Sequence, residues 1–267
     1  MRRLFIFGIL FLLMGTCAWS QTHKEPLFGK AEATYQVSSS ELKGAVFYLV
    51  SGHGGPDPGC IGHYQGKELH EDEYAYDIVL RLGRELLKKG AKVYFIIQDK
   101  KDGIRNTYVL KNSKRETCMG KKIPLNQIER LNQRCATINR LHRKERNAKY
   151  KRAIFVHVDS RSRNNQTDVF FYHAPKSRYG ERLAKEVQRT FRAKYKKFQP
   201  NRGFDGTVSE RNLHVLRNTT PIGIFLELGN IQNAQDQKRL VIPDNRQALA
   251  NWMTEAIVKD FKRTVKK

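Results

Sequence analysis

The stretch Ala45-Val46-Phe47-Tyr48-Leu49-Val50, followed by Ser51-Gly52-His53-Gly54-Gly55-Pro56-Asp57-Pro58-Gly59, joins an apolar run to a glycine-rich turn that contains a histidine. The run is short and rich in β-branched and aromatic residues, which is typical of a buried strand. Two further runs, 153–160 and 221–230, have the same character and also carry polar residues near their ends. Because a polar side chain is costly to bury unpaired, these runs predict strands of one sheet with functional groups at their ends.

The segments between these runs predict the helices. Tyr74, Ile78, Leu82 and Leu86 recur at four-residue spacing and indicate one amphipathic helix that ends near Lys88-Lys89-Gly90. Further helices are expected after Ile123-Pro124, over 177–194 and over 244–262; short strands are expected over 92–98, 168–172 and 213–216, and a loop over 198–210. This alternation predicts a single α/β domain with a mostly parallel twisted sheet and helices on both faces.

Four polar residues of these segments suggest metal-assisted hydrolysis. His53 and His157 lie at strand ends, and Glu71 stands one turn before Tyr74, on the helix face that points toward the same edge of the sheet. Two imidazoles and a carboxylate make a three-ligand zinc site that leaves a position for water. Glu227, at the end of the third apolar run, is then a candidate general base for that water.

Other residues compete for these roles. His63 and His70 are alternative histidine ligands, and Glu68 and Glu73 are alternatives to Glu71. The offset from the apolar stripe of the helix favours Glu71, because Glu73 would face away from that stripe.

The four segments resemble the zinc-dependent N-acetylmuramoyl-L-alanine amidases, the Amidase_3 type of cell-wall hydrolase. The resemblance is carried by Gly52-His53-Gly54-Gly55-x-Asp57-Pro58-Gly59, by Glu71, by His157-x-Asp159-Ser160, and by Pro221 through Glu227-x-Gly229-x-x-x-Asn233-x-x-Asp236, and it covers roughly residues 44–264. Asn230 and Gln232 depart from it, since the family usually has Phe and Ser there.

The resemblance implies an enzyme that cleaves the amide between N-acetylmuramic acid and L-alanine in peptidoglycan. It implies one Zn²⁺ held by His53, Glu71 and His157, with Glu227 as the catalytic residue. Around them it implies residues that shape the loops or contact ligands and substrate, namely Asp57, Arg134, Asn139, Asp159 and Asn233. Two other functions stay open: a zinc peptidase acting on stem peptides or other amides, and a non-catalytic peptidoglycan-binding module.

The first residues predict export to the periplasm or cell surface. Arg2 and Arg3 precede an apolar stretch, 4–14, and an A-x-S cleavage motif ends at Ser20, so residues 1–20 are expected to be a signal peptide. The stretch is shorter than the roughly 20 residues that a transmembrane span needs. Acylation of Cys17 in a lipoprotein is the alternative. Residues 21–43 are expected to be a polar, extended leader before the catalytic domain, 44–264.

The charge of the chain favours an anionic partner. The formal net charge is +24, and removing Arg2 and Arg3 leaves +22. Aromatic residues are hardly interleaved with the basic clusters, so a nucleic-acid partner is not expected. Peptidoglycan is the expected partner, although most basic clusters can also be simple solvated helix faces. Cys60, Cys118 and Cys135 would survive cleavage, and Cys118 could pair with Cys135.

Two segments bear on regulation. Residues 99–122, here called the insertion, begin where a strand ends, so they could form a lid, grip glycan or be a disordered surface loop. The interval between His157 and Glu227 contains too few clustered apolar residues for a helix that would plug the zinc site. Activity is therefore expected without an activator protein, although an unknown activator is not excluded by the sequence.

Overall fold

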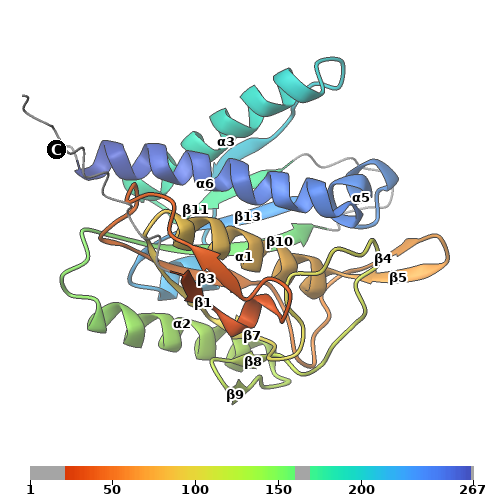
Figure 1. Ribbon diagram of the computed structural model, residues 1–267, viewed down its shortest axis with the longest axis horizontal. Helices are drawn as coiled ribbons and strands as arrows, with labels where there is room; N and C mark the ends of the chain where they lie inside the picture. The colour runs from red at the N-terminus through yellow and green to blue at the C-terminus, as the bar shows by residue number, and fades with distance from the viewer. Residues whose placement is uncertain (1–21, 160–168, 266–267) are drawn as a thin grey trace, which may run out of the picture.

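A mixed six-stranded sheet forms the centre of the molecule (Figure 1). The computed structural model describes residues 22–159 and 169–265, so the predicted signal peptide lies outside the described residues. The order across the sheet is β12 (Thr207–Glu210), β11 (Phe170–His173), β13 (Ile222–Asn230), β10 (Tyr150–Asp159), β3 (Ala45–Ser51) and β6 (Lys92–Phe95). Only the β11–β13 pairing is antiparallel. The prediction of a mostly parallel α/β sheet is confirmed.

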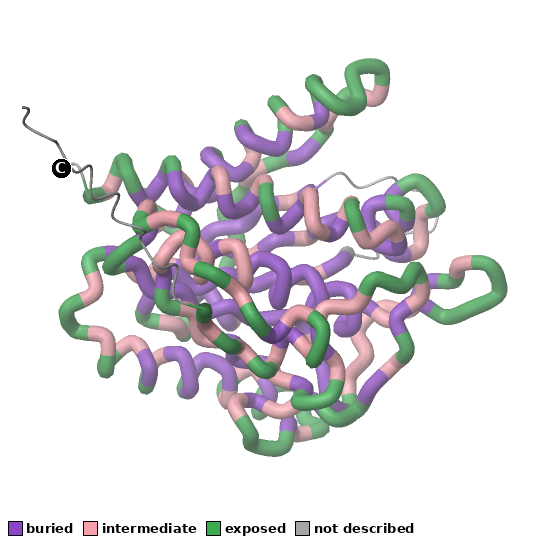
Figure 2. Tube along the Cα trace, viewed as in Figure 1, coloured by how far each residue is buried: buried purple, intermediate pink, exposed green. Residues whose placement is uncertain are grey.

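Helices cover both faces of this sheet, as predicted (Figure 1). One face is covered by α1 (Glu71–Lys88), α3 (Arg178–Phe198), α5 (Ala234–Val241) and α6 (Pro243–Val265), and the other by α2 (Gln127–Lys144) and α4 (His214–Asn218). Side chains of β3 alternate between the two resulting apolar clusters, with Phe47 in one and Tyr48 in the other. Figure 2 shows the burial that follows, with buried residues along the strands and on the inward sides of the helices.

In the described part of the chain, three small sheets are separate from this central sheet. β1 (Thr22–Lys24) pairs with β2 (Thr34–Gln36), and β4 (Ile61–Tyr64) pairs with β5 (Lys67–His70). The third sheet contains β7 (Ile97–Gln98), β8 (Thr117–Cys118) and β9 (Lys121–Lys122). The residues 22–43 that were expected to be an extended leader also include a short 3-10 helix, Pro26–Phe28, and they place Phe28 and Leu42 fully inside the core. This segment is therefore packed against the domain.

Several local predictions were wrong. Residues 213–216 were expected to be a strand, but His214–Asn218 form helix α4, whose Val215 and Leu216 are buried. In so short a segment, two adjacent apolar residues fit a strand as well as a helix. Neither the two-residue period of a strand nor the 3.6-residue period of a helix can be recognised over so few residues. The loop expected over 198–210 ends in β12, an edge strand, and the strand expected over 92–98 divides into β6 and β7.

The insertion is an ordered part of the fold, so the alternative of a disordered surface loop is excluded. β8 lies in the insertion, and Met119 donates a backbone hydrogen bond to the carbonyl of Ile96 at 3.0 Å. Arg246 of α6 donates to the carbonyl oxygens of Arg105 (2.7 Å) and Thr107 (3.0 Å). Among the described helices, none has both the length and the apolar character needed to cross a membrane.

Candidate active site

The loop after β3 brings His53 to the carboxyl edge of the sheet. His53 has a φ of 55° and precedes Gly54 and Gly55, so the chain turns sharply there. A Cβ atom at Gly52 would lie 2.4 Å from the ring of His157, and one at Gly59 would lie 2.7 Å from Oε2 of Glu71. Glycine is required at both positions because the candidate ligands occupy the space that a side chain would need.

Glu71 lies between the two histidines. Its Oε1 is 3.1 Å from Nδ1 of His157, and its Oε2 is 3.2 Å from Nε2 of His53. Each oxygen also accepts a backbone hydrogen bond, from Val158 (3.0 Å) and Cys60 (3.0 Å), so the plane of the carboxylate is fixed from two sides. The structure thus brings together the three residues predicted as ligands, with one candidate ligand atom from each within 4.8 Å of the others.

The three side chains alter one another's pKa values. Burial alone would raise the pKa of Glu71, but hydrogen bonds from His157 and His53 hold that pKa well below its usual range. Burial opposes protonation of His53, yet its contacts with Asp57 and Glu71 raise its pKa to about 10. Burial lowers the pKa of His157. A buried carboxylate between two imidazoles is a donor set that fits a divalent transition metal such as zinc.

Asp57 orients His53 for this role. Its Oδ2 lies 2.9 Å from Nδ1 of His53, which leaves Nε2 directed at Glu71. Asp57 in turn accepts from Nη2 of Arg130 at 2.5 Å. Such a carboxylate–histidine contact fixes the imidazole tautomer at metal sites. Arg130 was not singled out from the sequence, because nothing in its helical context distinguishes it from the neighbouring basic residues.

Glu227 lies beside His157 in the sheet. The two residues are register partners in the parallel β10–β13 pair, so their side chains emerge on the same face. On that face the ring of Phe225 stacks on His157 with 4.3 Å between the centroids. Glu227 is partly exposed and lies in the carboxyl-terminal half of β13, three residues before that strand ends.

The other predicted site residues are spread more widely. Arg134 is buried and donates from Nη2 to the carbonyl of His53, so it supports the ligand loop. Asn139 instead bonds to the carbonyl of Asn218 (2.9 Å) and the amide of Thr220 (2.7 Å), and Asn233 caps α5. Asn139 therefore joins α2 to the backbone at the end of α4, and Asn233 holds the start of its own helix. The side chain of Asp159 is outside the described part of the structure.

The rival ligands do not reach the site. His63 is exposed on the β4–β5 hairpin, and His70 pairs with Glu68 of the same hairpin at 3.2 Å. Glu73 was expected to face away from the apolar stripe of the helix, but it is buried, and Arg105 of the insertion binds its Oε2 at 2.8 Å. Cys118 and Cys135 are buried free thiols, without the disulfide considered for them.

Comparisons with known proteins show the family to which the chain belongs. Residues 48–259 match the family model described as N-acetylmuramoyl-L-alanine amidase, Amidase_3. The chain is 25% identical over 231 residues to "Probable cell wall amidase LytH" of Staphylococcus epidermidis; the match covers 86% of this chain but only 62% of the length of that relative.

Solved structures show the same fold. An N-acetylmuramoyl-L-alanine amidase from Clostridium difficile 630 superposes with a TM-score of 0.59 at 19% identity, covering 84% of this chain and 98% of that one. The CwlD amidase from Clostridioides difficile, solved in complex with the GerS lipoprotein, gives a TM-score of 0.58 at 17% identity, covering 81% and 98%. Because the family model spans most of the chain, this protein belongs to the N-acetylmuramoyl-L-alanine amidase family of the Amidase_3 type.

Proposed function

We propose that this protein hydrolyses the amide between N-acetylmuramic acid and L-alanine in peptidoglycan, using one zinc ion. The observation that carries the proposal is the convergence of His53, Glu71 and His157 within 4.8 Å, with Glu227 in register beside His157. Family membership supports the choice of substrate. The proposed ligand atoms are Nε2 of His53, a carboxylate oxygen of Glu71 and Nδ1 of His157.

The residues of the site then have distinct roles in the reaction. A zinc ion held there supplies a Lewis acid that makes water more acidic and polarises the substrate carbonyl. Glu227 accepts a proton from the attacking water and returns it to the departing amine nitrogen. A C–O bond forms, the C–N bond breaks, and the products are the lactyl carboxylate and a stem peptide with a free L-alanine amine. Asp57 keeps His53 in the tautomer that presents Nε2.

The substitution Glu227→Gln tests the catalytic role. Hydrolysis should fall on the order of 10²-fold or more, because the base is lost, while zinc content stays at the wild-type level. Glu68→Gln, on the exposed hairpin, is the matched control and should change neither quantity. His53→Ala and His157→Ala should lose zinc and activity together. Undiminished turnover in Glu227→Gln would refute the assignment, and full zinc retention in both histidine variants would move the metal site elsewhere.

The substrate class is tested by mass analysis of digested peptidoglycan. An amidase releases whole stem peptides that begin with a free L-alanine amine. A zinc peptidase cuts inside the stem peptide, and a binding module releases nothing, so each rival gives a different result.

We further propose that the isolated protein is active without a partner. Within the described residues between His157 and Glu227, α3 packs on the sheet and on α6, and α4 packs on α2 and β13. Neither helix is placed as a plug. The similar CwlD structure contains a lipoprotein partner, so the assay is run with purified protein alone. Zinc-loaded protein that stays inert until a second protein is added would contradict the proposal.

Export is proposed on the N-terminal pattern and on the likeness to a relative named as a cell wall amidase. Cleavage as expected gives a mature chain that begins at Gln21. Mass analysis of the secreted protein checks this: a lipid-modified N-terminus at Cys17, or a retained Met1, would contradict cleavage before Gln21.

A further inference from the structure

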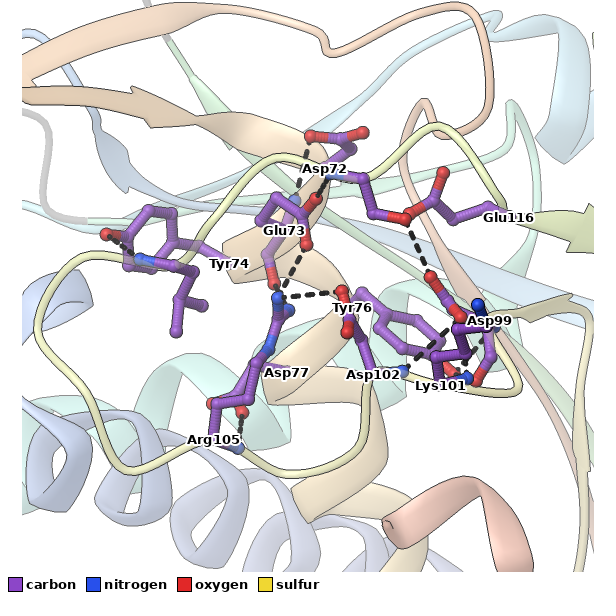
Figure 3. A network of polar contacts seen from close by, with 12 residues as sticks. Asp72, Glu73, Tyr74, Tyr76, Asp77, Asp99, Lys101, Asp102, Arg105 and Glu116 are labelled. Carbon is purple, nitrogen blue, oxygen red and sulfur yellow. Dashed lines mark hydrogen bonds and ion pairs between the residues drawn. The ribbon is translucent and has the colours of Figure 1, made fainter.

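A cluster of three buried carboxylates lies next to the candidate active site, on the side of the insertion. Asp72 and Glu73 belong to the first turn of α1, and Glu116 immediately precedes β8 (Figure 3). One carboxylate oxygen from each lies within 4.8 Å of the others, and the residues are only 3%, 1% and 6% exposed. Like charges at this spacing and burial repel one another unless a counter-charge is present.

Arginine side chains form ion pairs with only some of the carboxylates in this region. Arg105 binds Glu73 at 2.8 Å, and Arg115 binds Asp99 at 3.2 Å and Asp102 at 3.1 Å. Asp77 is paired with arginines of α1 and α6. By contrast, neither Asp72 nor Glu116 forms an ion pair with any residue that the structure describes. These two carboxylates therefore have no ion-pair partner among the described residues, and one divalent cation would balance them both when they are ionised.

Asp72 gives an independent indication of a ligand. Its Oδ1 accepts the backbone N–H of Glu73 at 2.9 Å, but its Oδ2 is buried and has no hydrogen-bond partner among residues 22–159 and 169–265. In Figure 3 this carboxylate and that of Glu116 face the same space. A buried carboxylate oxygen without a donor is rare in folded proteins. The positive end of α1 favours acids in its first turn, but it does not account for Glu116, which comes from another segment.

We propose that Asp72, Glu73 and Glu116 bind a second divalent cation, Ca²⁺, separate from the zinc site. Their donors are all oxygen atoms, which suit a hard cation, whereas the neighbouring site offers the imidazole nitrogens of His53 and His157 beside the Glu71 carboxylate. Calcium tolerates irregular coordination by carboxylates and backbone carbonyls, while Mg²⁺ demands near-octahedral geometry. This binding does not depend on the proposed hydrolysis.

The position of the cluster gives the cation a structural consequence. Glu116 accepts the backbone N–H of Gly55 at 2.9 Å, within the loop that carries His53. Asp72 directly follows Glu71, and Glu73 accepts the backbone N–H of Ser113 in the insertion. A cation bound to these three carboxylates would join the insertion, the His53 loop and the start of α1. The insertion would then be fastened to the active-site rim in a calcium-dependent way.

The test is a calorimetric titration of zinc-loaded protein with CaCl₂, with thermal unfolding measured in parallel. Zinc occupies the histidine site, so calcium cannot compete there. We expect one calcium ion per chain and a rise in Tm on adding calcium. Glu116→Gln keeps an acceptor for Gly55 and removes one charge, so it should weaken calcium binding by about tenfold or more. The control Glu181→Gln alters an exposed carboxylate on α3 and should bind calcium as the wild type does.

Measuring the Tm of the calcium-free protein distinguishes a cation-binding site from a carboxylate cluster that only supports the fold. Glu116→Gln should raise the Tm of the calcium-free protein, because one of the repelling charges is gone, and calcium should then add little. Asp72→Asn is the second variant and should behave in the same way. The proposal is overturned if millimolar calcium produces neither heat nor a Tm shift in the wild type, if both variants bind calcium normally, or if Mg²⁺ binds more tightly than Ca²⁺.

Discussion

Replacing Arg246 by Met removes a fully buried charge from the first turn of helix α6. The Arg246 side chain is 0% exposed, and its Nε binds Oδ2 of Asp77 at 2.6 Å. Its other nitrogens donate to four backbone carbonyls, two at the carboxyl end of α5 and two within the insertion, at residues 240, 241, 105 and 107. Methionine fills a similar volume without donating a hydrogen bond.

The expected loss of stability follows from the groups that remain. Removing one partner of a buried ion pair costs roughly 3–5 kcal/mol. Asp77 keeps Arg81 at 2.8 Å and the amide of Arg105 at 2.7 Å, and the carbonyl of Arg105 keeps Arg81 at 2.9 Å. The lower end of that range, about 3 kcal/mol, is therefore expected. For a domain of this size it corresponds to a fall in Tm of roughly 6–12 °C.

Urea and thermal unfolding of the zinc-loaded protein measure this effect. Lys259→Met is the control, because Lys259 lies on the same helix in an exposed pair with Glu255 and should cost no more than about 1 kcal/mol. Limited proteolysis is a second readout, since Arg246→Met should expose the insertion to cleavage between residues 99 and 116. If Arg246→Met and Lys259→Met unfold at the same temperature with the same protease sensitivity, Arg246 does not stabilise the fold or hold the insertion in place.

Two further predictions concern the zinc site. Asp57→Asn should lower zinc affinity by roughly 10–100-fold, because Asn orients His53 without its charge; metal titration checks this, and unchanged affinity would show that Asp57 only shapes the loop. Zinc affinity should also rise with pH, because the pKa of His53 in the metal-free protein is raised to about 10 and its proton must leave before zinc binds. Competition titrations between pH 6 and pH 8 should show a gain of about tenfold per unit, and a flat profile would contradict the protonated state of His53.

The sequence was sufficient to predict the main strands and the principal helices, and the structure brings together the three residues that it predicts as ligands. Apolar runs and four-residue periodicity are local properties, so β3, β10, β13 and α1 were recognisable without knowledge of their neighbours. The preference for Glu71 over Glu68 and Glu73 also rested on a local property, its offset from the apolar stripe. The structure places the Glu71 carboxylate between His53 and His157, as the resemblance implied.

Short elements were less predictable. None of the following elements is longer than five residues: the hairpin strands β4 and β5, the edge strand β12 and helix α4. Their patterns are too short to separate a strand from a helix or a loop, so tertiary contacts decide their conformation. The contacts of Asn139 were unpredictable for a similar reason, since its position in the sequence does not reveal that it bonds to the last residue of α4; its role at the active site stays a prediction.

The chain's own sequence determined which long segments become strands and helices and which side chains stand near their ends, because these depend on neighbours a few residues away. Only the tertiary structure decided which distant charges meet. Arg246 reaches Asp77 and the insertion, and Glu116 joins Asp72 beside Glu71, across separations that no local pattern encodes. Packing sets those distances, and burial makes them matter, because desolvated charges must find partners where the fold places them.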